Sequence, residues 1–229
     1  PDTITNFLPI QQKGENAEIV TQYEMHTVEQ LGLLKMDFLG LRNLSIIDRT
    51  LKLINNENLD FDNLELDDEK TFKLFAEGKM TGVFQLESRV AQSVSRNLNP
   101  KRFEDIVALV ALIRPGPLGA GMHNEFADRA NLRKEIKYLH PDLKEVLEET
   151  YGVILYQEQV MQIAQKIAGF DLQEADNLRV AMGKKIPKVM EEQRKKFTDG
   201  AVYKNYSEQF AIEVFDQIAY FAGYGFNKS

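Results

Sequence analysis

Apolar residues recur every three or four positions along most of the chain, which is the spacing of amphipathic helices. In the first such stretch, Leu44, Ile47, Leu51 and Ile54 share one helical face. Glycines, prolines and capping residues such as Ser207 separate one stretch from the next. The pattern predicts helices over residues 44–54, 70–77, 88–97, 100–113, 119–130, 141–147, 157–168, 171–183, 187–203 and 207–222.

Strict alternation of apolar and polar residues is rare and predicts only short strands. Over residues 33–38 the apolar side chains point to one side of an extended chain, whereas Lys35 and Asp37 point to the other. Because so few strands are expected, the predicted fold class is α+β and mostly α-helical. Three shorter strand candidates are Ile19–Gln22, Val83–Gln85 and Val153–Leu155.

An acidic, Asn-rich connector over residues 55–69 interrupts the periodic pattern. We predict a domain boundary within it, between residues 1–64 and residues 65–229. The first part holds the better strand candidate, and the second is almost entirely helical. No internal repeat or low-complexity segment is present.

The formal net charge of −7 argues against a protein that wraps nucleic acid over its whole surface. The charge is uneven, since residues 178–204 hold eight basic side chains and three acidic ones. Such a basic patch suits an anionic partner, although a solvated helical face has the same composition. Charge alone leaves both interpretations open.

The chain contains no cysteine, which excludes disulfides and thiolate metal sites and fits a cytoplasmic protein. No run of 18 or more apolar residues predicts a membrane span. The sequence begins Pro1-Asp2-Thr3, without an initiator Met or a basic and apolar leader. We therefore expect a segment from the interior of a longer protein.

Lys35 and Asp37 form the sharpest candidate constellation. On a strand their Cα atoms would lie about 7 Å apart on the same face. A carboxylate suits Mg²⁺ and an ammonium suits phosphate, so the pair could hold a metal-bound triphosphate. A half-exposed strand with a charged outer face would show the same two residues. Asp60 and Asp62 could also bind a metal, but their place in the connector favours a solvated turn.

The sequence gives little support to a zinc site, a catalytic triad or a glycine-rich phosphate loop. The residues His26, His123 and His140 are scattered and have no zinc-ligand or triad spacing. The glycines form neither a Rossmann nor a Walker phosphate loop. These observations argue against dehydrogenase and acyl-transfer functions.

Several basic residues occupy turns or helix ends, where their side chains could be aimed. Arg114 precedes a rigid Pro-Gly-Pro turn, Lys184 and Lys185 follow a glycine, and Lys228 lies in a Gly/Asn turn. Together they could line a phosphate-binding face. Each could instead stabilise the C-terminal end of a helix dipole.

Seven short motifs are spread in order over essentially the whole chain. They are Lys35-Met36-Asp37-Phe38-Leu39-Gly40-Leu41-Arg42, Gly82-Val83-Phe84-Gln85-Leu86-Glu87-Ser88, Phe103-Glu104-Asp105-Ile106, Arg114-Pro115-Gly116-Pro117, Tyr151-Gly152-Val153 with Tyr156-Gln157-Glu158-Gln159-Val160-Met161, Ala181-Met182-Gly183-Lys184-Lys185 and Tyr224-Gly225-Phe226-Asn227-Lys228-Ser229. In this order the motifs resemble the bacterial DNA polymerase III alpha subunit family, and seven motifs in order are far more specific than any one of them.

The resemblance implies a DNA-directed DNA polymerase that adds deoxynucleotides to a primer 3′ end. Asp37 matches the third of three aspartates that hold two Mg²⁺ ions in the family, and the upstream Pro-Asp-x-Asp pair is absent from this sequence. Lys35 matches a position near the incoming triphosphate. Basic positions that resemble those facing nucleotide and template are Arg114, Arg179, Lys184, Lys185 and Lys228.

The same resemblance implies that residues 1–64 are the C-terminal part of a palm and residues 65–229 a fingers domain. The implied partners are primer–template DNA, deoxynucleotides and other replisome subunits. With one metal-binding aspartate, the segment alone should be inactive. Arg89-Val90-Ala91 departs from the family pattern and puts a nucleotide contact by Ser88 or its neighbours in doubt. The alternative is a non-catalytic helical module that binds nucleic acid or protein through the 178–204 patch.

Overall fold

The computed structural model describes residues 2–12, 14, 18–36, 38, 40–55, 60–61, 63–184 and 187–228. The chain divides into two compact units, residues 1–59 and residues 60–229. This division falls inside the predicted connector, while the boundary at residue 64 stays a prediction. The described part of the chain is mostly helical and has one small sheet, which confirms the predicted fold class.

The first unit contains a two-stranded antiparallel sheet. Strands β1 (Ile10–Gln12) and β2 (Ile19–Thr21) pair with each other, and Gln11 lies opposite Val20. The strand predicted at Ile19–Gln22 is confirmed, whereas β1 was not predicted. The helical elements of this unit are η1 (Ile4–Asn6), α1 (Met25–Gln30) and α2 (Asn43–Ile54).

The strand predicted over residues 33–38 is wrong for the residues that are described there. Residues 33–36 and 38 form no regular structure. Leu34 and Phe38 are 84% and 92% exposed, so these two side chains of the expected apolar face bury little surface against the described residues. Alternation favours a strand only where a neighbouring strand supplies hydrogen bonds, and the described strands pair only with each other. Asp37 lies outside the described residues.

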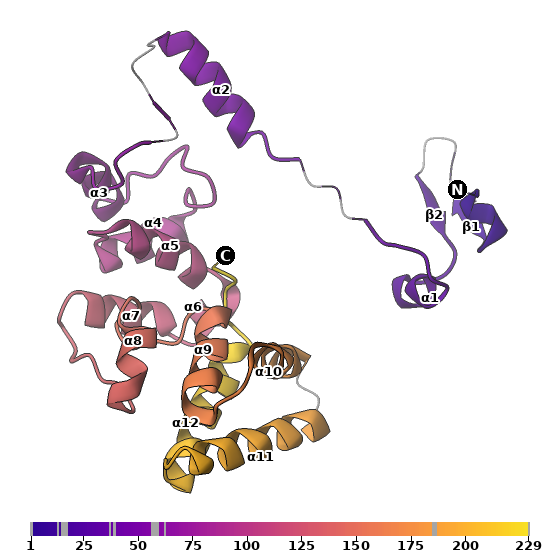
Figure 1. Cartoon of the computed structure of the whole chain (residues 1–229). Coiled ribbons are helices and arrows are strands. Elements are labelled where there is room, and N and C mark those ends of the chain that lie inside the picture. The colour runs from indigo at the N-terminus through magenta and orange to yellow at the C-terminus, as the bar shows by residue number, and fades with distance from the viewer. Residues whose placement is uncertain are drawn as a thin grey trace. The chain divides into compact units, whose positions relative to one another are not determined.

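The second unit begins with a helical layer around one apolar cluster. Leu109, Leu112 and Phe126 are fully buried in it, and helices α4 and α7 pack side by side. This layer occupies the upper part of the second unit in Figure 1. Its helices are α3 (Glu69–Ala76), α4 (Arg89–Leu98), α5 (Phe103–Leu112), α6 (Pro115–Gly119) and α7 (Met122–Ala130).

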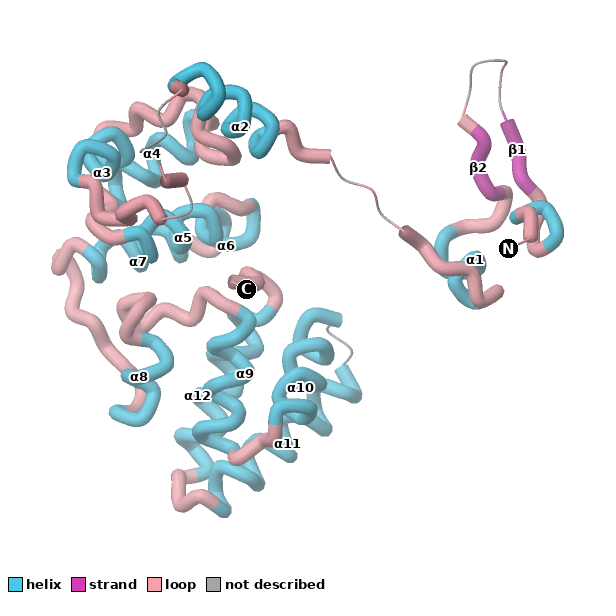
Figure 2. Tube along the Cα trace, turned by 45° about the horizontal axis from the view of Figure 1, so that its top comes forward, coloured by secondary structure: helices cyan, strands magenta, loops and turns pink. Residues whose placement is uncertain are grey.

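A second cluster fills the remainder of this unit, where Ile163, Phe197 and Phe215 are fully buried. Helix α9 packs against α10, α11 and α12, as both views show (Figures 1 and 2). The elements around this cluster are η2 (Pro141–Leu143), α8 (Lys144–Leu147), α9 (Gln157–Ala168), α10 (Leu172–Lys184), α11 (Pro187–Tyr203) and α12 (Glu208–Ala222).

The capping residues explain why these helices start where they do. The Ser207 hydroxyl accepts a hydrogen bond from the Phe210 N–H, as expected for the predicted cap. Asp171 and Glu174 form the predicted reciprocal capping box, with bonds of 2.7 and 2.9 Å.

Two local predictions need correction. The strand predicted at Val83–Gln85 is wrong, because Gln85 has a φ of 62° and the segment forms consecutive turns. The Pro-Gly-Pro break does end α5, but Pro115 then opens the short helix α6. Proline suits the first turn of a helix, where the missing N–H would have no partner.

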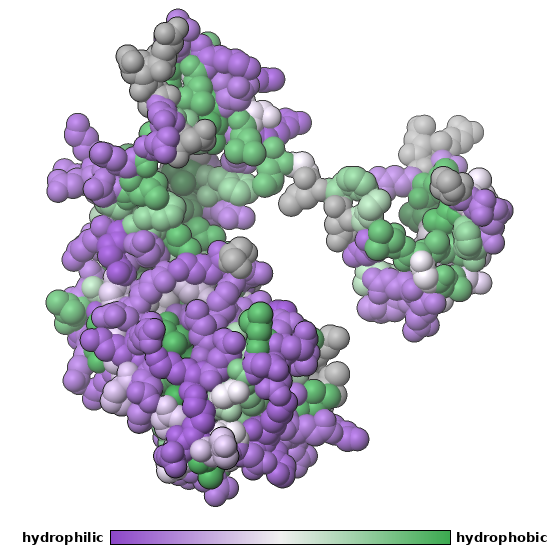
Figure 3. Space-filling model, in the orientation of Figure 1, coloured by the Kyte–Doolittle hydropathy of each residue, from purple (hydrophilic) through white to green (hydrophobic). Residues whose placement is uncertain are grey.

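The surface of the second unit differs between its layers. Figure 3 shows hydrophobic surface gathered over α4 and α5, whereas the same face over α9, α11 and α12 is mainly hydrophilic. The polar face agrees with the many charged residues of α11.

Candidate nucleotide and nucleic-acid interface

A short C-terminal segment, residues 224–228, pairs with the chain that leads into α9. The Phe226 N–H donates to the Leu155 carbonyl at 3.0 Å, and the Gln157 N–H donates to the Phe226 carbonyl at 2.9 Å. Tyr156 and Phe226 thus form an isolated parallel bridge. The regular strand predicted at Val153–Leu155 is wrong, because this one bridge is the only pairing that the described residues offer it.

Arg114 holds this C-terminal segment from the start of α6. Its Nη2 donates to the Tyr224 carbonyl at 2.5 Å, and its Nε donates to the Ala111 carbonyl at 3.0 Å. The guanidinium also lies over the Phe226 ring, 4.9 Å from the ring centre. Burial lowers the pKa of Arg114, yet an arginine stays charged at neutral pH.

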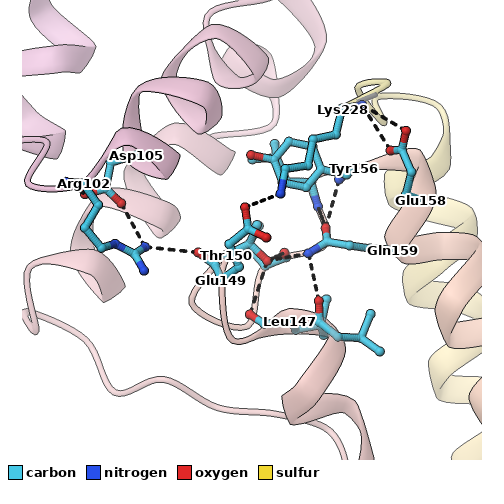
Figure 4. A network of polar contacts seen from close by, with 12 residues as sticks. Arg102, Asp105, Leu147, Glu149, Thr150, Tyr156, Glu158, Gln159 and Lys228 are labelled. Atoms are coloured by element: carbon cyan, nitrogen blue, oxygen red, sulfur yellow. Dashed lines mark hydrogen bonds and ion pairs between the residues drawn. The ribbon is translucent and has the colours of Figure 1, made fainter. Parts of the chain in front are cut away.

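Lys228 lies at the far end of the same segment (Figure 4). Its Nζ donates to Glu149 Oε1 at 2.5 Å and lies 5.2 Å from the centre of the Tyr156 ring. Its backbone N–H donates to the Glu158 carboxylate at 3.1 Å. Burial, together with nearby carboxylates, raises the pKa of Tyr156. The Lys228 ammonium is thus paired with the Glu149 carboxylate in this structure.

Arg179, on α10, reaches the same junction. It forms an ion pair with Asp176 at 2.8 Å, and its Nη1 donates to the Gln157 side chain at 3.2 Å. The side chain of Gln157 also donates to the Gly225 carbonyl at 3.4 Å. The structure thus brings Arg114, Arg179 and Lys228 around one junction, although they lie far apart in the sequence.

The remaining predicted site residues are Lys35, Lys184, Lys185 and Asp37. Lys35 belongs to the first unit, where its Nζ contacts the Met25 sulfur at 3.4 Å. Lys184 is the last residue of α10, and only its backbone is described. Lys185 and Asp37 lie outside the described residues.

Sequence reasoning missed a buried polar network beside the junction. Asp105 is 3% exposed and accepts bonds from the Tyr151 hydroxyl at 2.9 Å and from Arg102 Nη2 at 3.1 Å. Burial and the Asp105 carboxylate raise the pKa of Tyr151 to about 12. Asp105 and Tyr151 belong to two of the seven family motifs, and this membership was the one sign in the sequence that they matter. No rule of sequence spacing predicts a contact between residues so far apart.

Gln159 connects this region to the start of α9. Its Oε1 accepts from the Leu155 and Tyr156 N–H groups at 2.9 and 3.0 Å. Its Nε2 donates to the Thr150 hydroxyl at 2.8 Å and to the Val146 carbonyl at 3.2 Å (Figure 4). A buried amide with all these partners fixes the backbone that pairs with the C-terminal segment.

Four of the eight basic residues in the patch over residues 178–204 form ion pairs with acids. Besides Arg179, Lys195 pairs with Asp199 and Lys196 with Glu174, both at 2.6 Å, and Arg194 pairs with Asp216. This pairing lowers the net positive potential of α11 and agrees with a solvated helical face. It gives no specific support to the alternative of a non-catalytic binding module.

The described residues contain no group of three or more His, Asp or Glu side chains placed to hold a metal ion. Asp60 accepts a hydrogen bond from the Asn63 amide at 2.6 Å, which fits the predicted turn, and Asp62 lies outside the described residues. No helix in the described ranges is both long and apolar enough to cross a membrane.

The comparison with known families assigns most of the chain to a polymerase finger domain. Residues 43–205 match the model of the bacterial DNA polymerase III alpha subunit finger domain, and the chain belongs to this family. Residues 1–40 match the model of the bacterial DNA polymerase III alpha NTPase domain. The resemblance that the motifs carry is thereby confirmed.

Curated relatives are similar in sequence to this chain over its whole length. It is 48% identical to the DNA polymerase III subunit alpha of Escherichia coli strain K12 and to that of Vibrio cholerae, and 47% identical to that of Bacillus subtilis. All of the chain is covered in each comparison, but only 20–21% of each relative. The chain thus spans about one fifth of the length of these relatives.

Proposed function

We propose that the protein containing this chain is a DNA-directed DNA polymerase that extends a primer 3′ end with deoxynucleotides during bacterial chromosome replication, in the cytoplasm. The observation that carries the proposal is the finger-domain match over residues 43–205, together with about half identity to named polymerase subunits along the whole chain. Its substrates would be primer–template DNA and deoxynucleoside triphosphates, and its partners other replisome subunits.

Within that polymerase, residues 65–229 supply the fingers and residues 1–64 the C-terminal part of the palm. The fingers present cations to the nucleotide and template phosphates, namely Arg114, Arg179, Lys184, Lys185 and Lys228. The junction geometry supports different roles for these cations. Two N–H groups of Arg114 donate to backbone carbonyls, so Arg114 acts mainly by holding the segment that carries Lys228.

Asp37 is proposed as one of three aspartates that hold two Mg²⁺ ions, with Lys35 near the incoming triphosphate. One carboxylate from this chain cannot form such a site alone, so the other ligands must come from elsewhere in the protein. When bound, the two ions activate the primer 3′ oxygen and stabilise the leaving pyrophosphate.

The contribution of the chain's own residues is positional and electrostatic. Phosphoryl transfer needs alignment and neutralisation of charge more than covalent help. A cation held by a rigid scaffold loses less entropy on binding a phosphate than one on a mobile side chain. The Gln159 and Asp105 networks supply that rigidity around the junction.

A primer-extension assay with a radiolabelled primer tests the proposal. The full-length protein should extend the primer in the presence of Mg²⁺ and deoxynucleotides, and the 229-residue chain alone should not. A full-length protein that binds primer–template but never extends it would refute the polymerase function. Robust extension by the isolated chain would refute the division of the metal site between this chain and the rest of the protein.

A further inference from the structure

Glu158 lies in the first turn of α9 and faces the C-terminal segment (Figure 4). Its carboxylate accepts the backbone N–H of Lys228, at 3.1 Å for Oε1 and 3.2 Å for Oε2. The first turn of a helix favours a negative charge, because the N–H groups there carry partial positive charge. The helix thus supports an ionised acceptor at the point where the C-terminal segment passes it.

Other contacts from α9 hold the residues that precede Lys228. The Gln157 N–H donates to the Phe226 carbonyl at 2.9 Å, and the Gln157 side chain donates to the Gly225 carbonyl at 3.4 Å. These bonds fix the segment at Gly225 and Phe226. The Glu158 carboxylate adds a bond at Lys228 itself, so α9 also holds the main chain from which the lysine side chain extends.

Two glutamates therefore act on different parts of Lys228. Glu149 Oε1 accepts a hydrogen bond from Nζ at 2.5 Å, so it would compete with a phosphate for the ammonium. Glu158 accepts the backbone N–H instead, and a phosphate bound at the ammonium would leave that bond intact. The side chain of Lys228 would thus exchange one anion for another while its main chain stays in place.

We infer that Glu158 is a positioning residue for Lys228, an inference that rests on the proposed polymerase function. By holding the Lys228 N–H, it sets where the ammonium meets the triphosphate of the incoming deoxynucleotide. A lysine side chain is long and flexible, so a fixed main chain limits the positions that its ammonium reaches. Displacing a positioned group by about 1 Å is enough to slow a reaction roughly 100-fold.

The test measures kcat/KM for incorporation of a single deoxynucleotide by the full-length protein on a primer–template. Glu158→Ala should lower kcat/KM about 10- to 100-fold, because a hydrogen bond to a charged acceptor is lost and Lys228 is displaced. Glu158→Gln should recover most of that loss, since its amide oxygen still accepts the N–H although the charge is gone. Glu208→Ala is the matched control, because Glu208 is an exposed glutamate in the first turn of α12 and has no proposed role.

A double-mutant cycle shows whether Glu158 acts through Lys228. Lys228→Ala removes the ammonium and keeps the backbone N–H. In the Lys228→Ala background, Glu158→Ala should lower kcat/KM by no more than about 2-fold further, since the ammonium that it positions is absent. A merely structural role would lower kcat/KM by the same factor in both backgrounds.

Folding of each variant is checked by its melting temperature. If Glu158→Ala does not fold, Glu158→Asp takes its place, because its shorter side chain keeps the charge and withdraws the carboxylate from the N–H. Equal effects in the two backgrounds would overturn the inference, as would a Glu158→Gln variant that is as slow as Glu158→Ala.

Primer extension by the unmodified protein is measured alongside. If that protein extends primers and Lys228→Ala does so at the same rate, the positioning role fails while the proposed function stands. An unmodified protein that never extends a primer would refute the proposed function itself, and the inference with it.

Discussion

Arg114 Nη2 donates a 2.5 Å hydrogen bond to the backbone carbonyl of Tyr224, 110 residues further along the chain. This bond joins the Arg-Pro-Gly-Pro motif to the C-terminal Tyr-Gly-Phe-Asn-Lys motif. The same C-terminal segment pairs with the start of α9, so three motifs meet at one junction. The conformation of residues 224–228, and hence the place of Lys228, depends on contacts that are remote in sequence.

Gly116→Ala should disturb this junction, because a Cβ at that position would lie 2.3 Å from Tyr224 Cδ1. We expect the variant to lose about 1–3 kcal/mol of unfolding free energy, as is typical of overpacking. Primer extension by the full-length variant should fall as well. Gly119→Ala is a matched control in the same helix, since its Cβ would meet nothing within 4 Å. Urea denaturation measures the unfolding free energy of both variants. Equal values would contradict the close packing of Gly116 against Tyr224.

Tyr151→Phe should remove the hydroxyl that bonds to the buried Asp105 carboxylate. Leaving a buried acceptor with one partner fewer should cost about 1–3 kcal/mol near neutral pH. Chemical denaturation measures this loss, and a variant as stable as the parent would show that the network contributes nothing.

The same tyrosine should make stability depend on alkaline pH. Its pKa is raised to about 12 in the folded chain, from an ordinary value near 10. The unfolded state therefore loses this proton first, and the stabilisation present below pH 10 should disappear as the pH rises toward 12. Tyr151→Phe should show a shallower decline over that window. Identical slopes for the parent and the variant would refute the assignment.

Glu149→Gln should free the Lys228 ammonium from its present carboxylate partner, at 2.5 Å. If Lys228 contacts phosphate, the affinity of the full-length protein for a deoxynucleoside triphosphate should rise about 1.5- to 5-fold, in line with the small free energy of an exposed ion pair. Glu148→Gln is the control, because Glu148 pairs with Lys144 instead. Isothermal titration measures both variants, and weaker binding by Glu149→Gln would argue against the proposed role of Lys228.

Periodicity predicted the helices well because each buries one apolar face. The helix predicted over residues 157–168 is confirmed as α9, with its end at Gly169 in the left-handed conformation. The capping pair Asp171 and Glu174 was also recognisable, since both partners lie within one turn. Signals of this kind are local.

The features that were not predicted depend on distant partners. Alternation at residues 33–38 suggested a strand, but no described strand pairs with it, so the expected geometry of Lys35 is not formed. Asp105 and Tyr151 meet across 46 residues, and no spacing rule anticipates such a contact. The family motifs include the segments that form the junction, but they do not show which of their residues are in contact.

We propose that Asp37 is a metal-binding aspartate of a DNA polymerase, and an Asp37→Asn variant of the full-length protein is the most direct test. We expect this variant to keep the melting temperature and primer–template affinity of the parent and to lose Mg²⁺-dependent extension of a labelled primer. Extension by Asp37→Asn at close to the parent rate would show that Asp37 does not hold a catalytic metal ion.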